Sequence, residues 1–133
     1  RTVFERRLQW QGTRDIAGCL SVPAAIDFHQ GDLAGATRER CHQMALEAMH
    51  ALRTRFGLPA IGADSDFAQM VPIPVPPCDA EALRRRLFEQ HRIEVPVTQH
   101  DGRSFVRVSV QAYNTAQDLQ RLATALGQEF GGG

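Results

Sequence analysis

The sequence contains no lysine: all 15 of its basic side chains are arginine, and 15 acidic residues bring the formal net charge to zero. Chemistry that needs a lysine amine, such as Schiff-base formation with a carbonyl group, therefore has no side chain to use in this chain. Nucleic-acid-binding domains usually carry an excess of basic charge, which this composition does not provide. We expect no nucleic-acid partner.

Cysteine is scarce and apolar runs are short. The three cysteines, Cys19, Cys41 and Cys78, are widely spaced and odd in number, which suits neither a disulfide framework nor a zinc site with paired ligands. We expect buried thiols and no bound metal. No apolar run approaches the roughly 20 residues of a membrane-spanning helix, and the opening residues lack a secretion-signal pattern. We therefore expect a cytoplasmic protein with no membrane partner.

Capping residues followed by apolar side chains at steps of three and four predict the helices. The chain, 133 residues with 43% hydrophobic content, has the length of roughly one domain with one core. The predicted helices start after Ser21, Thr37, Asp79 and Thr115, the first ending near Gly31 and the second at Gly57. Thr115 and Asp118 form a pattern typical of a capping box.

Alternating valines and isoleucines predict a hairpin. They occupy positions 93, 95 and 97 and then 106, 108 and 110, with the turn pair Asp101 and Gly102 between them. The apolar segment 67–75 also favours a strand, but prolines from Pro72 onwards restrict that prediction to its beginning. The predicted fold is α+β: a small antiparallel sheet of three to four strands with helices on one face.

Two segments near opposite ends carry the most specific patterns. Residues 10–15 read Trp-Gln-Gly-Thr-Arg-Asp and are followed by Val-Pro-Ala-Ala-Ile at 22–26, whereas 105–114 read Phe-Val-Arg-Val-Ser-Val-Gln-Ala-Tyr-Asn. These segments resemble the Trp-x-Gly-Thr-x-Asp and Val-Arg-x-Ser-x-x-x-Tyr-Asn patterns of class V aminotransferase-like enzymes. Ile-Glu-Val-Pro at 93–96 is similar to the isopenicillin N epimerase branch of that family. The order and spacing of these pieces across nearly the whole chain make the resemblance specific.

The resemblance implies the C-terminal domain of a fold-type I enzyme that uses pyridoxal phosphate (PLP). In such enzymes a large domain binds the cofactor, a smaller C-terminal domain closes over it, and two subunits share each active site. Residues 1–20 would then be an interdomain segment with a cofactor-phosphate loop, 21–130 the small α/β domain and 131–133 a flexible tail. The implied partners are an amino-acid substrate and a second copy of the parent enzyme.

Gly12 and Thr13 match the Gly-Thr pair with which the family contacts the cofactor phosphate of the neighbouring subunit. The residue types suit that role, because a glycine lets a backbone N–H approach an anion and a threonine hydroxyl adds a donor. Without the resemblance, an ordinary turn with Asp15 as the cap of the next helix would be the preferred interpretation.

Arg107 matches the family's arginine that binds the α-carboxylate of the substrate. Alternation along the strand points Val106 and Val108 one way and Arg107, with Phe105 and Ser109, the other way. A guanidinium there can grip a carboxylate through two parallel hydrogen bonds. Spacing alone slightly favours a surface ion pair worth about 0–1 kcal/mol, and the resemblance reverses that order.

We expect no catalytic residue in this chain and no activity from it alone, because family enzymes join PLP to a lysine amine that the sequence lacks. The parent would be an epimerase, aminotransferase or lyase acting on an amino acid. An alternative is a stand-alone α/β dimerisation or interaction module without a cofactor, which should bury Trp10 in its own core. A ligand-sensing ferredoxin-like domain is a third possibility, for which the sequence shows no pocket motif.

Overall fold

The computed structural model describes residues 2–9, 12–13 and 15–131, which form two compact units, Arg1–Gly35 and Ala36–Gly133. Trp10, whose burial would distinguish the alternatives above, lies outside the described residues. The predicted domain boundary at residue 20 stays a prediction, and the helix that begins after Ser21 falls in the first of these units. Among the described residues, no helix is both long and apolar enough to span a membrane.

The described residues of the first unit form α1 (Val3–Gln9), α2 (Ala17–Leu20), α3 (Val22–Gln30) and the start of α4 (Asp32–Phe56). Helix α1 was not predicted, although Thr2 and Glu5 form a capping box at its start: Glu5 N donates to Thr2 Oγ1 and Thr2 N donates to Glu5 Oε2. Helix α3 has the predicted bounds. Ser21 does not cap it, however, because its hydroxyl donates to the carbonyl of Gly18 instead.

The second unit contains most of the long helix α4 (Asp32–Phe56), the short 3₁₀ helix η1 (Asp64–Asp66), α5 (Ala80–His91) and α6 (Ala116–Phe130). Helix α4 ends before Gly57 as predicted, with that glycine at a φ of +63°, but begins before Thr37. Asp79 caps α5 by accepting a hydrogen bond from Ala82 N, and Thr115 caps α6 by accepting one from Asp118 N. These two predicted caps are confirmed.

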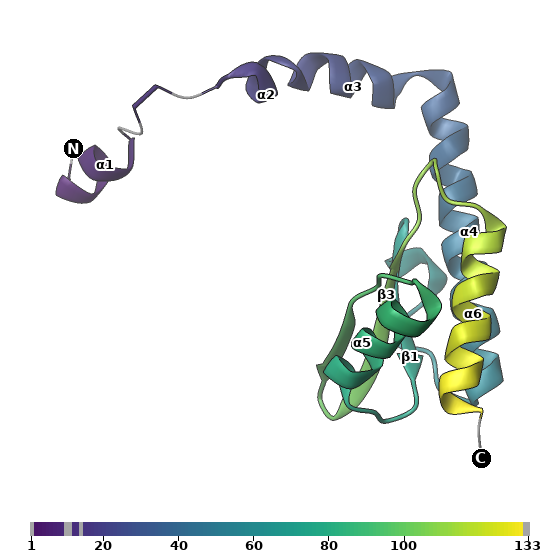
Figure 1. The fold of residues 1–133 in the computed structure, drawn as a ribbon. Helices are drawn as coiled ribbons and strands as arrows, with labels where there is room; N and C mark the ends of the chain where they lie inside the picture. Colours follow the sequence, from purple (N-terminus) through teal and green to yellow (C-terminus); the bar gives the residue numbers. More distant parts are fainter. Residues whose placement is uncertain (1, 10–11, 14, 132–133) are drawn as a thin grey trace. The chain divides into compact units, whose positions relative to one another are not determined.

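Three antiparallel strands, β1 (Met70–Val75), β2 (Val97–His100) and β3 (Arg103–Ser109), form the sheet in the order β1-β3-β2 (Figure 1). The restriction of β1 to the beginning of its segment was wrong, because the strand runs through Pro72 and Pro74. It is an edge strand, and its prolines pair with Arg107 and Phe105 of β3. The missing N–H groups of alternate residues can therefore face the open edge, where no ladder bond is lost.

The hairpin between β2 and β3 is confirmed, but β2 begins only at Val97. Asp101 and Gly102 form its turn with φ angles of 48° and 72°, as a two-residue turn of the primed type requires. The preceding residues 93–96 lie outside the regular strand. The carbonyl of Pro96 still accepts a hydrogen bond from Arg107 N, so this segment continues the line of β2 before its first residue.

The predicted α+β fold with helices on one face of a three-stranded sheet is confirmed. Buried side chains from α4, α5 and α6 form one cluster with the inward residues of β1 and β3: Cys41, Ala45, Leu46, Met49, Leu52, Val71, Ile73, Val75, Leu83, Leu87, Val106, Val108, Val110, Leu122, Ala125 and Leu126. One expectation about burial was wrong: Cys19 is exposed, whereas Cys41 is buried as expected.

Candidate functional site

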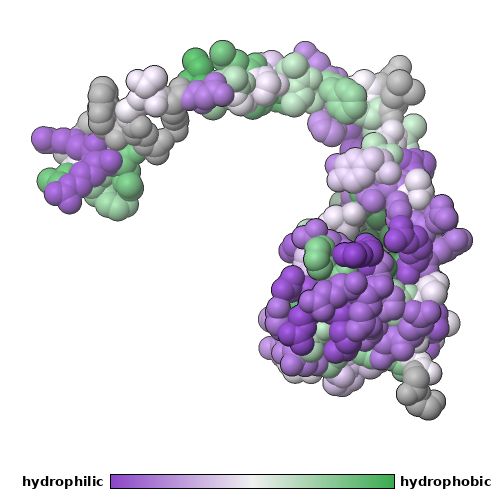
Figure 2. All heavy atoms as spheres, in the orientation of Figure 1, coloured by the Kyte–Doolittle hydropathy of each residue, from purple (hydrophilic) through white to green (hydrophobic). Residues whose placement is uncertain are grey.

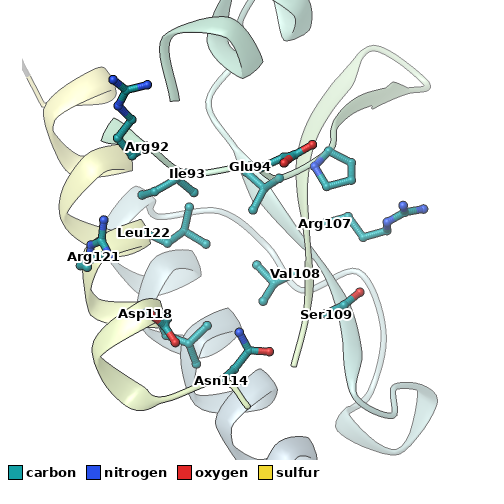
Figure 3. A pocket seen from close by; sticks show the side chains of 13 residues that line it. Arg92, Ile93, Glu94, Arg107, Val108, Ser109, Asn114, Asp118, Arg121 and Leu122 are labelled. Carbon is teal, nitrogen blue, oxygen red and sulfur yellow. The ribbon is translucent and has the colours of Figure 1, made fainter. Parts of the chain in front are cut away.

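Arg107 lies in the middle of β3 on the face of the sheet that the helix cluster leaves open. Val106 and Val108 on either side of it are 0% and 5% exposed, whereas Arg107 is exposed. Figure 3 shows Val108 pointing towards Leu122 of α6, and Arg107 and Ser109 pointing to the other side of the strand. Strand alternation therefore places the guanidinium as the sequence predicted, on the open face.

A cleft of about 330 Å³ borders this strand. Residues 92–96, residues 107–109 and the beginning of α6 line it, with Ile93, Leu119 and Leu122 among the apolar side chains. Arg107 lies at the rim, and its guanidinium points out of the cleft (Figure 3). In the described part of the chain, this guanidinium makes no hydrogen bond or ion pair, so its donors are available to an anion.

Hydrogen bonds from α4 hold the loop that connects β3 to α6 beside the cleft. The Arg40 guanidinium donates to the carbonyls of Ala112 at 3.0 Å and Asn114 at 3.5 Å. Asn114 Oδ1 also accepts a hydrogen bond from Gln111 N. The backbone and hydroxyl of Thr115 donate to Asp118, and these hydrogen bonds lower the pKa of the Asp118 carboxyl. These contacts fix the end of the cleft from which α6 begins.

Arg103 lies on the same face of β3 as Arg107, two positions before Phe105. Its guanidinium carbon is 5.3 Å from the centroid of the Phe105 ring. Among the described residues, no ion pair involves Arg103. Sequence reasoning did not single it out, although the same alternation that selected Arg107 places Arg103 on that face.

Gly12 and Thr13 belong to the first unit, and Arg107 to the second. Both residues of the pair are exposed; Gly12 has a φ of +70°, and a Cβ added to it would meet nothing within 4 Å. Asp15 Oδ1 accepts a hydrogen bond from Ala17 N at 2.8 Å, so the turn is also tied to the start of α2. The two exposed residues therefore carry a backbone amide and a hydroxyl as potential donors.

The described residues contain no group of three or more histidine, cysteine, aspartate or glutamate side chains able to hold a metal ion. A cluster of ionisable side chains lies between α5 and α6 and consists of Arg86, His91 and Glu129. Glu129, whose side chain is 9% exposed, accepts hydrogen bonds from Arg86 Nε at 2.6 Å and His91 Nε2 at 3.2 Å. This cluster was not predicted, because its members are far apart in sequence.

A three-stranded antiparallel sheet, covered by helices on one face and with an exposed strand arginine on the other, has the architecture of the small C-terminal domain of fold-type I PLP enzymes. The solved structure of 8-amino-7-oxononanoate synthase from Francisella tularensis matches 71% of this chain and 27% of its own, with a TM-score of 0.55. At 21% identity this likeness shows the fold alone.

Sequence comparison identifies relatives by name. Over 124 residues, 91% of its length, the chain is 38% identical to isopenicillin N epimerases of Amycolatopsis lactamdurans and Streptomyces clavuligerus. Over 136 residues it is 30% identical to a probable chloroplastic L-cysteine desulfhydrase of Arabidopsis thaliana. The predicted resemblance to class V aminotransferase-type enzymes, isopenicillin N epimerase branch, is thereby confirmed. The chain spans 31% of the length of the epimerases, and no family model matches it.

Proposed function

We propose that this chain is the C-terminal domain of a PLP-dependent enzyme acting on an amino acid, and that Arg107 binds the α-carboxylate of the substrate. The observation that carries the proposal is the exposed guanidinium of Arg107, without an ion pair among the described residues, on the open face of β3. A planar guanidinium in that position can donate two parallel hydrogen bonds to a carboxylate and fix its orientation.

In the proposed enzyme, this chain would contact the phosphate of the cofactor. Gly12 and Thr13 are exposed and carry the amide and hydroxyl donors that such a contact needs, whereas no lysine is present to join the cofactor covalently. When bound, PLP supplies an electron sink for negative charge at the substrate's α-carbon. By holding the α-carboxylate, Arg107 would restrict the orientation of that carbon, and the large domain of the parent would have to supply the lysine.

The length of the relatives and the exposed apolar surface of the first unit both support the proposal that this chain is part of a larger enzyme. The epimerases are matched over only 31% of their length. Figure 2 shows apolar side chains at the surface along α2 and α3, where Leu20 and Phe28 are 70% and 74% exposed. Large apolar side chains exposed together mark a surface that another protein surface covers. In the proposed enzyme, the large domain or the second subunit of a homodimer covers them.

The reaction is one of three that the relatives and the resemblance suggest: epimerisation, β-elimination or transamination. The names of the relatives include an epimerase and a desulfhydrase. The cytoplasmic location stays a prediction. The exposed apolar residues of α2 and α3 also suit the alternative, an interaction module without a cofactor, which would bind another chain but show no dependence on PLP.

Replacing Arg107 with alanine in the full-length protein tests the proposal. We expect the affinity for the amino-acid substrate to fall by about tenfold or more, because at least one charged hydrogen bond is lost. The absorbance of bound PLP should be unchanged. Arg85→Ala, at an exposed position of α5, is the matched control. Unchanged substrate affinity in the Arg107 variant would contradict the assigned role.

A further inference from the structure

Within the regular strands, the open face of the sheet carries basic residues but no acidic ones. Strand alternation and the register of the three strands assign to this face Met70, Pro72 and Pro74 of β1, Thr98 and His100 of β2, and Arg103, Phe105, Arg107 and Ser109 of β3. None of these side chains is a carboxylate. Before the start of β2, the hydrogen bond from Arg107 N to the Pro96 carbonyl continues the register and puts the exposed Glu94 on this face opposite Ser109, away from Arg103. An anion that reaches the Arg103 end of the face therefore meets an arginine whose charge no carboxylate of the regular strands compensates.

Phe105 holds the first of these arginines in place. The Arg103 guanidinium lies over the ring of Phe105, which is itself only 9% exposed and thus a fixed support. A guanidinium stacked on an aromatic face keeps the N–H groups on its edge available for an anion, and stacking reduces the conformational freedom that binding would otherwise remove. The nearest acidic side chain in the turn, Asp101, contacts His100 at 3.3 Å.

We propose that Arg103 binds a second anion of the same substrate, so that the substrate is an amino acid whose side chain ends in a carboxylate. Arg103 and Arg107 are four residues apart, about 13 Å between Cα atoms along a strand. With the α-carboxylate on Arg107, an aliphatic side chain would run along β3 towards Phe105 and bring its terminal carboxylate to the guanidinium of Arg103. This inference rests on the proposed role of Arg107. It favours a longer acidic substrate over L-cysteine, which the desulfhydrase relatives are named for.

The test uses pairs of amino acids that differ only in a terminal carboxylate: 2-aminoadipate with norleucine, 2-aminopimelate with 2-aminoheptanoate, and 2-aminosuberate with 2-aminooctanoate. Binding to the full-length holoenzyme is measured by calorimetry and by the change in cofactor absorbance. We expect wild type to bind at least one dicarboxylate about tenfold more tightly than its neutral partner. Arg103→Gln should remove that preference without weakening the neutral ligand. Arg103→Lys should restore part of it.

The outcomes for the Arg103 and Arg107 variants distinguish the two claims. If Arg103→Gln and wild type show the same preference for dicarboxylates, or if neither shows any, the role of Arg103 is refuted while that of Arg107 stands. Loss of binding by Arg107→Gln for acidic and neutral ligands alike supports the shared α-carboxylate contact. If Arg107→Gln binds every ligand as wild type does, the proposed function itself fails. Arg85→Gln, on a helix that covers the opposite face, controls for the loss of a surface charge.

Discussion

At the scale of single residues, Glu129 shows how a partly buried carboxylate is kept ionised. Burial by itself would raise the pKa of Glu129, but hydrogen bonds from Arg86 and His91 outweigh it and leave the pKa below the ordinary value of 4.5. A glutamate whose folded-state pKa is lowered stabilises the fold above its unfolded-state pKa. That contribution is lost as the pH falls through the lowered folded-state value.

We therefore expect Glu129→Gln to lower the free energy of unfolding at neutral pH by about 1 kcal/mol, because the contacts with Arg86 and His91 weaken. The difference from wild type should shrink as the pH falls from about 4.5. Urea unfolding at pH 7 and at acidic pH measures both effects. Glu89→Gln, an exposed change on α5, should show neither. A difference that is constant across this range would contradict the ionised state of Glu129.

At the scale of elements, α4 and α6 lie side by side (Figure 1), and a contact of Arg55 with Ala123 and Gly127 joins them. The Arg55 guanidinium donates to the carbonyl of Ala123 at 3.2 Å and occupies the space where a Cβ on Gly127 would lie. Glycine inside a helix is ordinarily about 1 kcal/mol less favourable than alanine. Here it makes room for the arginine that links the two helices.

The effect of Gly127→Ala on the free energy of unfolding should therefore depend on the residue at position 55. With Arg55 present, we expect little net change in the free energy of unfolding, because the gain in helix propensity is offset by displacement of the guanidinium from Ala123. In an Arg55→Ala background the same change should stabilise the domain by about 1 kcal/mol. A double-mutant cycle measured by chemical denaturation gives this coupling directly. Equal effects in both backgrounds would show that the two residues do not compete for space.

At the scale of the whole molecule, the two proposed contacts lie in different units of the chain. In the proposed function, Gly12 and Thr13 of the first unit would donate to a phosphate, and Arg107 of the second would donate to a carboxylate. Neither contact replaces the lysine that the chain lacks. The proposed function is therefore a property of the assembled parent enzyme.

In that enzyme, Thr13→Val should weaken binding of PLP because a hydroxyl donor to the phosphate is lost. We expect the dissociation constant of the cofactor to rise by about fivefold to tenfold, which equilibrium dialysis against PLP measures. The substrate preference attributed to the arginines of β3 should not change. Thr124→Val, on the exposed side of α6, removes a hydroxyl of the same kind away from the turn and should bind PLP as wild type does. Identical affinities for both variants would remove Thr13 from the phosphate contact.

The sequence by itself determined the elements whose signals are local. Caps at Asp79 and Thr115, the turn at Asp101 and Gly102, and the alternation of β3 each depend on neighbouring residues, and the structure has all of them. The same alternation was sufficient to place Arg107 on the exposed face. Family resemblance then attached a role to that position, and the role remains a proposal.

Only the tertiary structure decided what depends on distant partners. Pro72 and Pro74 are tolerated in β1 because it is an edge strand, a fact that follows from the strand order and not from the segment itself. Likewise, the contacts of Glu129 with α5 and of Arg55 with α6 join residues far apart in the chain. The surroundings of Arg103 on the open face, where the regular strands carry no carboxylate, arise only when three strands are in register, because no single strand contains them.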